Sequence, residues 1–169
     1  GQRLAERSIQ LGSASCVGLD PHLTRLPTAM AESVQASLSR ADTESASAVV
    51  EEFCLGAIEA LVDVVPAVKP QVAFFEQLGW SGVRALERVV ESARAKGLLV
   101  VLDAKRGDIG STAKAYAAAG LAPTASCASD AMTVSPYLGP ESLQPYTEYF
   151  GSGAGIFVLV RTSNPGSIR

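Results

Sequence analysis

The most informative part of this sequence is LLVVLDAKRGDIG, residues 98–110. It begins with five apolar residues in a row, which is typical of a β-strand covered on both faces. Asp103, Lys105 and Asp108 then follow within six residues, although aspartate and lysine are poor strand formers. Charges placed at the end of a buried strand indicate a parallel α/β fold, in which functional side chains gather at the carboxyl ends of the strands.

Apolar runs on either side of this stretch predict four more strands, at residues 16–19, 64–68, 131–134 and 156–160. Helical periodicity predicts helices near 4–11, over 44–62, 83–96 and 112–119, and after Pro140. We expect Ser81 to cap the helix over 83–96 and Gly97 to follow its end in a left-handed conformation. Polar composition predicts flexible loops over 29–43 and 124–130. Alternating strands and helices build a parallel sheet, either open or closed into a barrel.

The turn after the first strand favours the barrel over the open sheet. An open doubly wound sheet usually has a glycine-rich turn at this point, whereas this chain has Asp20-Pro21-His22. The glycines of residues 151–155 come before a strand, which is the wrong order for dinucleotide binding. We interpret that cluster as a plain turn.

Composition predicts one domain over residues 1–169, with 47% apolar and 18% charged residues. The net charge of −3 and the lack of a basic run argue against a nucleic-acid partner. No apolar run reaches membrane-spanning length, and residues 1–10 lack a signal-peptide pattern. We interpret the three cysteines as small, buried, unpaired side chains. Their odd number predicts a protein of the reducing cytoplasm. A single histidine, His22, excludes a multi-histidine metal site.

The charged residues suggest acid–base chemistry without a cofactor. Asp103 and Lys105 are two positions apart, so they share one side of a strand. Together with Lys69 and Asp108 they sum to zero charge, which offsets much of the cost of burial. A lysine between carboxylates stays protonated and can donate a proton to a carbanion, as decarboxylation requires. A structural ion-pair network, a Schiff-base aldolase using Lys105 and a non-catalytic binding module remain the alternatives.

Five motifs together resemble the longer bacterial branch of the orotidine 5′-phosphate decarboxylase family. They are CVGLDPH (16–22), VKPQVAFFE (68–76), DAKRGDIG (103–110), TVSPYLG (133–139) and TSNPG (162–166). The resemblance implies a TIM barrel that converts orotidine 5′-monophosphate to UMP as a homodimer, with no metal or organic cofactor. Sugar-phosphate relatives that share the DxKxxD pattern typically have an acidic metal ligand where this chain has Lys69, which makes a magnesium-dependent relative the weaker interpretation.

The resemblance also implies catalytic roles for the charged residues. Lys105 would protonate C6 of the pyrimidine and Asp103 would lie beside the substrate carboxylate. Lys69 would complete the charge network and reach the ribose. Asp108 would act across the dimer interface, in the site of the partner subunit.

Three further residues would contact the substrate. Thr112 would join Asp108 across the interface, Asp20 would hold a ribose hydroxyl and Ser163 would contact the pyrimidine edge. His22 receives only a loop or packing role. Five strands cannot close an eight-stranded barrel, so we expect three more strand–helix units and the phosphate-binding residues beyond Arg169.

Overall fold

A computed structural model of the chain describes residues 1–167. Its five strands are ordered β1-β2-β3-β4-β5 in one sheet. Strand β2 pairs in parallel with β1 and with β3, and β4 pairs in parallel with β5. The chain forms two compact units, Gly1–Val101 and Leu102–Arg169. Strand β3 (Leu99–Arg106) begins in the first unit and ends in the second.

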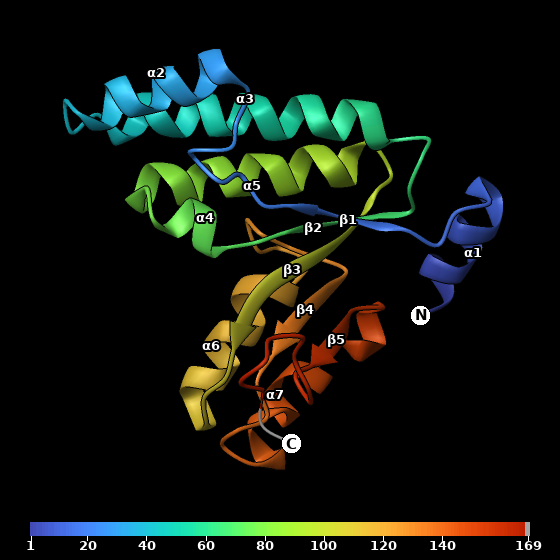
Figure 1. The fold of residues 1–169 in the computed structure, drawn as a ribbon. Coiled ribbons are helices and arrows are strands. Elements are labelled where there is room, and N and C mark those ends of the chain that lie inside the picture. The colour runs from blue at the N-terminus through green and yellow to red at the C-terminus, as the bar shows by residue number, and fades with distance from the viewer. Residues whose placement is uncertain (168–169) are drawn as a thin grey trace. The chain divides into compact units, whose positions relative to one another are not determined.

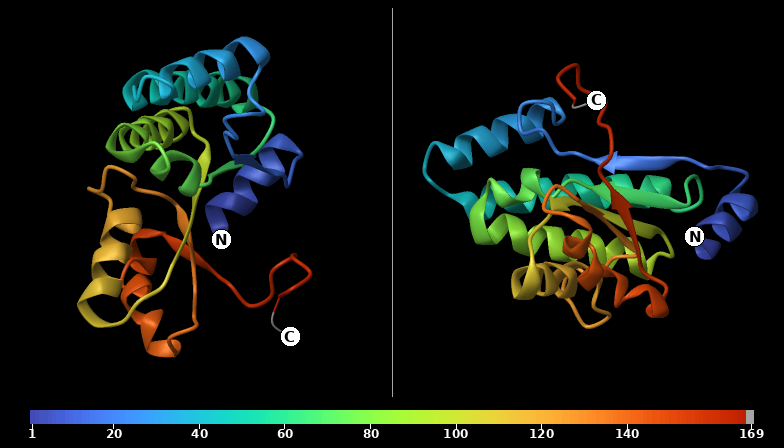
Figure 2. Two further views of the ribbon diagram at one scale, coloured as in Figure 1. Left: turned by 60° about the vertical axis from the view of Figure 1, so that its left-hand side comes forward. Right: turned by 90° about the horizontal axis from the view of Figure 1, so that it is seen from below.

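The first unit is built from helices that pack beside short strands (Figure 1). Its elements are α1 (Gln2–Leu11), β1 (Cys16–Leu19), α2 (Thr28–Leu38), α3 (Thr43–Leu61), β2 (Ala67–Pro70), α4 (Ala73–Glu76) and α5 (Gly79–Ala95). Helices α2 and α5 both pack against α3, and all views show α3 and α5 side by side (Figure 2). Ile58 of α3 and Val89 of α5 are fully buried, and burial of each such side chain contributes about 1.5–3 kcal/mol.

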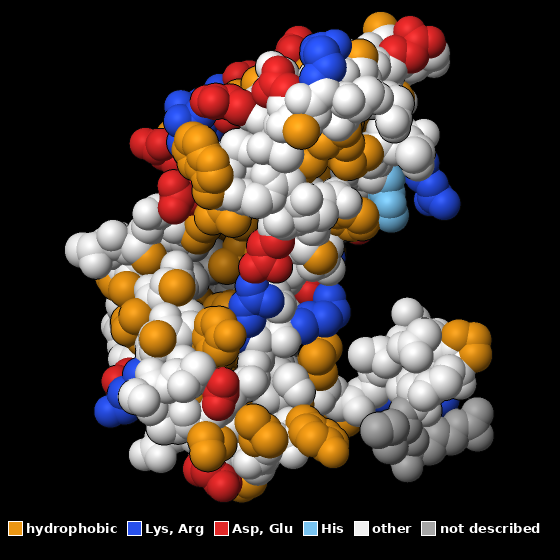
Figure 3. Space-filling model, turned by 90° about the vertical axis from the view of Figure 1, so that its left-hand side faces the viewer, with side chains coloured by type: hydrophobic (Ala, Val, Ile, Leu, Met, Phe, Trp, Pro, Cys, Tyr) orange, Lys and Arg blue, Asp and Glu red, His pale blue; other side chains and the backbone are white. Residues whose placement is uncertain are grey.

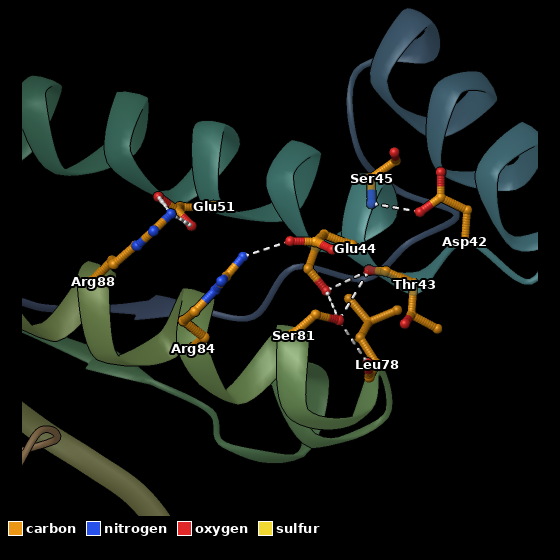
Figure 4. A network of polar contacts seen from close by, with 10 residues as sticks. Asp42, Thr43, Glu44, Ser45, Glu51, Leu78, Ser81, Arg84 and Arg88 are labelled. Carbon is orange, nitrogen blue, oxygen red and sulfur yellow. Dashed lines mark hydrogen bonds and ion pairs between the residues drawn. The ribbon is translucent and has the colours of Figure 1, made fainter.

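Polar contacts fix the pairing of α3 and α5 (Figure 4). The buried Ser81 hydroxyl of α5 contacts the Ser47 hydroxyl at 3.0 Å and donates to the Thr43 carbonyl at 3.1 Å. Two exposed ion pairs, Arg84–Glu44 and Arg88–Glu51, run along the same helices. Exposed ion pairs contribute little to stability, so the buried hydroxyl contacts are the more significant polar contacts between the two helices.

The second unit continues the strand–helix alternation. Its elements after β3 are α6 (Gly110–Leu121), β4 (Ala131–Val134), η1 (Pro140–Ser142), α7 (Gln144–Thr147), η2 (Phe150–Ser152) and β5 (Gly155–Val158). Ala113 and Ala117 of α6 are buried, as are Val134 of β4 and Tyr146 of α7. Gly120 allows α6 to approach β4 closely, because a Cβ there would lie 2.8 Å from the Met132 sulfur.

The strands and long helices confirm the predicted α/β pattern, with shifted ends. Strands 16–19 and 131–134 match β1 and β4, and Gly97 follows α5 with a φ of 79°. Strand β2 begins three residues late, because Val64 and Val65 still hydrogen-bond to the end of α3. The helix predicted after Pro140 is broken into η1, α7 and η2, and Phe150 is exposed there.

Two local predictions were wrong. Residues 29–43 are not a flexible loop: most of them form α2, whose Val34 is buried. Ser81 does not cap α5, because the helix begins two residues earlier at Gly79 and the Ser81 hydroxyl faces α3. The loop over 124–130 is confirmed as non-helical, non-strand chain.

The cysteines differ in exposure. Cys54 is buried in α3, as expected, whereas Cys127 is half-buried and Cys16 is exposed, contrary to the prediction. Hydrophobic and charged side chains both lie at the surface, and the single histidine is visible there (Figure 3).

Among residues 1–167, no helix combines the length and the apolar character needed to cross a membrane.

Candidate active site

Strand β3 extends further than the apolar run that predicts it. It continues to Arg106, so Asp103 and Lys105 lie inside the strand rather than after it. Their spacing of two places both side chains on one side of the strand. The Lys105 Nζ donates to Asp103 Oδ1 at 2.5 Å, which confirms that the two charges are paired.

The two partners differ sharply in exposure. The Asp103 side chain is 7% exposed, and the Lys105 side chain is 45% exposed. A buried carboxylate left without a partner would cost about 3–5 kcal/mol, so Asp103 depends on its donors. Lys105 therefore anchors one side of its ammonium group on a buried carboxylate while solvent, or a ligand, can reach the rest.

Sequence reasoning missed a third member of this cluster, Thr133 of β4. Its hydroxyl donates to Asp103 Oδ1 at 2.9 Å and accepts the backbone N–H of Lys105 at 2.9 Å. Thr133 is buried and is the one polar residue in AMTV, the four residues of β4. A single hydroxyl in an otherwise apolar strand, at the start of the TVSPYLG motif, was the sequence feature that could have indicated a role for Thr133.

The backbone of Lys105 is strained. Its φ of 48° lies in the left-handed region, which costs a residue with a side chain about 1–2 kcal/mol. Just beyond it, the Ser135 N–H donates to the Arg106 carbonyl at 2.8 Å. A Cβ at Gly107 would lie 2.8 Å from the Ser135 carbonyl oxygen, so only glycine fits there. The strained turn is thus held between Thr133 and Ser135.

Asp108 lies in the loop that leads into α6. Its carboxylate accepts the N–H of Ile109 at 2.8 Å. The pKa of the buried Tyr146 phenol is raised, chiefly by burial, and the nearby Asp108 charge contributes. Thr112 is exposed in the first turn of α6. Asp108 and Thr112 therefore both lie at the N-terminal end of α6. In the part of the chain that the structure describes, neither is hydrogen-bonded to Asp103 or Lys105.

In the first unit, Asp20 and Lys69 stand at the same edge of the β1–β2 pair. Lys69 is opposite Gly18 in the parallel register, and Asp20 directly follows β1. Burial raises the pKa of the Cys16 thiol, and the nearby Lys69 charge lowers it in part. The His22 ring packs edge-on against the Phe74 ring, with 4.3 Å between the ring centroids, which agrees with the packing role expected for His22.

Ser163 belongs to a closed turn after β5. The Thr162 N–H donates to the Ser167 hydroxyl at 3.1 Å, and the Ser167 N–H donates to the Asn164 carbonyl at 3.0 Å. Ser163 itself is exposed at this turn. Across the described part of the chain, no group of three histidine, cysteine, aspartate or glutamate side chains could hold a metal ion.

Comparison with known proteins identifies the family. The model of the "Orotidine 5′-phosphate decarboxylase / HUMPS family" matches residues 14–169. The chain belongs to this family. Its relatives include the orotidine 5′-phosphate decarboxylases of Rhodopirellula baltica, 49% identical, and of Streptomyces coelicolor, 47% identical. The matches cover 94% and 98% of this chain, and 53% and 55% of those proteins.

Solved orotidine 5′-phosphate decarboxylase structures show the same fold. A Streptomyces avermitilis protein provisionally assigned that activity is 46% identical, with a TM-score of 0.81 over 98% of this chain and 54% of its own. The Leishmania donovani OMP decarboxylase is 38% identical, with a TM-score of 0.74 over 98% of this chain and 54% of its own. These neighbours are TIM barrels, which confirms the predicted fold class. The chain spans about half the length of the curated relatives it matches and covers part of the barrel.

Proposed function

We propose that this chain belongs to an enzyme that decarboxylates orotidine 5′-monophosphate to UMP in pyrimidine nucleotide synthesis. The observation that carries the proposal is the pair formed by a half-exposed Lys105 ammonium and a buried Asp103 carboxylate. The relatives named orotidine 5′-phosphate decarboxylase, 49% and 47% identical to this chain, support the choice of substrate.

The reaction needs only a stabilised carbanion and a proton. The bond between C6 of the pyrimidine and its carboxylate breaks, carbon dioxide leaves and the electron pair stays on C6. The positive charge of Lys105 stabilises this developing carbanion. Lys105 then donates a proton to C6 and is reprotonated by solvent. Asp103 keeps the ammonium in place and lies beside the substrate carboxylate, and the scheme uses no cofactor.

The other roles rest on the family resemblance of individual motifs. Lys69 extends the charge network and reaches the ribose, Asp20 holds a ribose hydroxyl and Ser163 contacts the pyrimidine edge. The cytoplasm is the proposed location, because the substrate is a nucleotide intermediate.

A homodimer is the proposed assembly, with Asp108 and Thr112 serving the site of the partner subunit. Exposed apolar side chains in the same part of the second unit support an interface there. Ile109 is next to Asp108, Tyr116 lies one turn along α6 from Thr112, and both are exposed. Tyr137 and Leu138, which follow β4, are exposed as well.

The test follows the ultraviolet absorbance of orotidine 5′-monophosphate in the presence of the complete natural polypeptide. Wild-type protein should consume the substrate, and Lys105→Ala should lower the rate by roughly 10²–10⁴-fold, the usual contribution of a general acid. Lys114→Ala, which removes an exposed lysine of α6, is the matched control and should keep the wild-type rate. Borohydride added together with a carbonyl substrate should trap no adduct on Lys105, because its ammonium group is paired with the Asp103 carboxylate and is not the free amine that a Schiff base needs. Near-normal turnover by Lys105→Ala would contradict the proposal.

A further inference from the structure

Thr133 makes two hydrogen bonds that converge on the Asp103–Lys105 pair. Its hydroxyl has a single proton, which it gives to Asp103 Oδ1, and a lone pair, which accepts the Lys105 backbone N–H. The residue is 8% exposed, so water does not readily replace either bond. The same carboxylate oxygen also accepts the Lys105 ammonium. One hydroxyl thus connects the backbone of Lys105 to the carboxylate that binds its side chain.

The left-handed conformation of Lys105 explains why a side chain is needed at this point. In a regular parallel ladder, backbone N–H groups donate to carbonyls of the neighbouring strand. At Lys105 the φ of 48° departs from the strand conformation, and its N–H meets the Thr133 side chain instead. The next residue of β3 is bonded through its backbone, because the Ser135 N–H donates to the Arg106 carbonyl at 2.8 Å. The Thr133 hydroxyl therefore accepts the Lys105 N–H at the point where the backbone leaves the strand conformation.

We infer that Thr133 is a positioning residue, whose hydroxyl holds Lys105 in its left-handed conformation and orients the Asp103 carboxylate toward the ammonium group. The consequence for turnover rests on the proposed function, whereas the consequence for the backbone does not. Valine has nearly the same shape as threonine but can make neither bond. Serine keeps the hydroxyl and loses only a methyl group.

The test compares Thr133→Val with Thr133→Ser in the complete natural polypeptide. Misplacing a reacting group costs about 10²-fold in rate. We expect Thr133→Val to lower kcat by about this factor with KM nearly unchanged, since Thr133 touches the pair and not the substrate. Thr133→Ser should restore most of kcat. A purely structural role would lower the amount of folded protein without this split between kcat and KM.

Hydrogen exchange supplies a readout that does not depend on turnover. The Lys105 amide should exchange faster in Thr133→Val than in wild type, and the serine variant should keep its protection. The Ser135 amide, bonded to Arg106, is the internal control and should not change. If wild-type protein does not act on orotidine 5′-monophosphate, the proposed function fails, and the Lys105 amide alone decides the inference. Unchanged exchange at Lys105, an equal rise at Ser135 or no rescue by serine would overturn it.

Discussion

Asp103 and Lys105 illustrate how much a single spacing can predict. Two charges separated by one residue in a strand had to share a side, and they form an ion pair. The left-handed φ of Lys105 could not be predicted, because nothing in a lysine's type favours that region. The role of Thr133 was missed because threonine is an ordinary strand residue. Its position as the one polar residue of β4 gave a hint, and the 2.9 Å distance from its hydroxyl to Asp103 Oδ1 shows the contact.

The thiol of Cys54 should be inert in the folded protein. Burial in α3 raises its pKa to about 12, so the thiol stays protonated at neutral and mildly alkaline pH and lacks the reactive thiolate. The pKa of the Cys16 thiol is also raised, but by less, and its side chain is exposed. We predict that iodoacetamide at pH near 8 leaves Cys54 unmodified while it labels Cys16, as mapped by mass spectrometry. Denaturant should make both reactive. Equal labelling of the two thiols in the native state would show that α3 is not packed as described.

For the helix pair α3–α5, apolar periodicity predicts that the helices exist but not where α5 begins. Apolar periodicity predicted both helices, because each buries one face against the other. The boundary of α5 was misplaced, since its first turn contains Gly79, Trp80 and Ser81 rather than apolar residues that repeat at helical spacing. Helix α2 was missed because its serine- and alanine-rich sequence buries little apolar surface apart from Val34.

Two helical glycines should respond in opposite ways to alanine. A Cβ at Gly82 of α5 would lie 2.0 Å from the Phe75 carbonyl oxygen, whereas a Cβ at Gly56 of α3 meets nothing within 4 Å. Gly82→Ala should therefore lower the free energy of unfolding by about 3 kcal/mol, because the backbone near α4 must shift. Gly56→Ala should raise it by ~0.5–1 kcal/mol, because alanine favours the helix. Chemical denaturation measures both, and similar effects of the two changes would contradict the packing of α4 on α5.

The start of α3 should be sensitive to acid. Asp42 caps the helix by accepting hydrogen bonds from Ser45. These bonds lower the pKa of the Asp42 carboxyl from its usual 3.8, and the Ser45 side chain contributes more than the Ser45 backbone N–H. A lowered folded pKa means that the stabilisation is complete above the unfolded pKa and is lost as pH falls through the folded one. Asp42→Ala should lower the melting temperature by a few degrees at neutral pH, whereas Asp42→Asn should keep most of the cap.

The matched pair separates capping from charge. The advantage of wild type over Asp42→Ala should shrink as the pH drops below about 3.8, while that of Asp42→Asn should not. Thermal melts at neutral and acidic pH provide the comparison. An advantage of wild type that stayed constant in acid would mean that the carboxylate is not the capping group.

At the level of the assembled protein, the proposed exchange of Asp108 between subunits can be tested by complementation. Lys105→Ala and Asp108→Asn should each be inactive alone. In a mixed dimer, one site receives intact Lys105 from one subunit and intact Asp108 from the other. Random mixing should therefore restore about a quarter of wild-type activity. Absence of any recovery, with mixed dimers demonstrated by mass spectrometry, would place Asp108 in the site of its own subunit.

The fate of the proton at C6 tests the central claim, that Lys105 completes a decarboxylation. Orotidine 5′-monophosphate is incubated with the complete natural polypeptide in deuterium oxide, and the product is analysed by proton NMR. Exchangeable protons on the lysine are replaced by deuterium, so we predict UMP with deuterium at C6 from wild type and essentially no UMP from Lys105→Ala. Untouched substrate with wild-type protein, or deuterated UMP formed at the wild-type rate by Lys105→Ala, would contradict the claim.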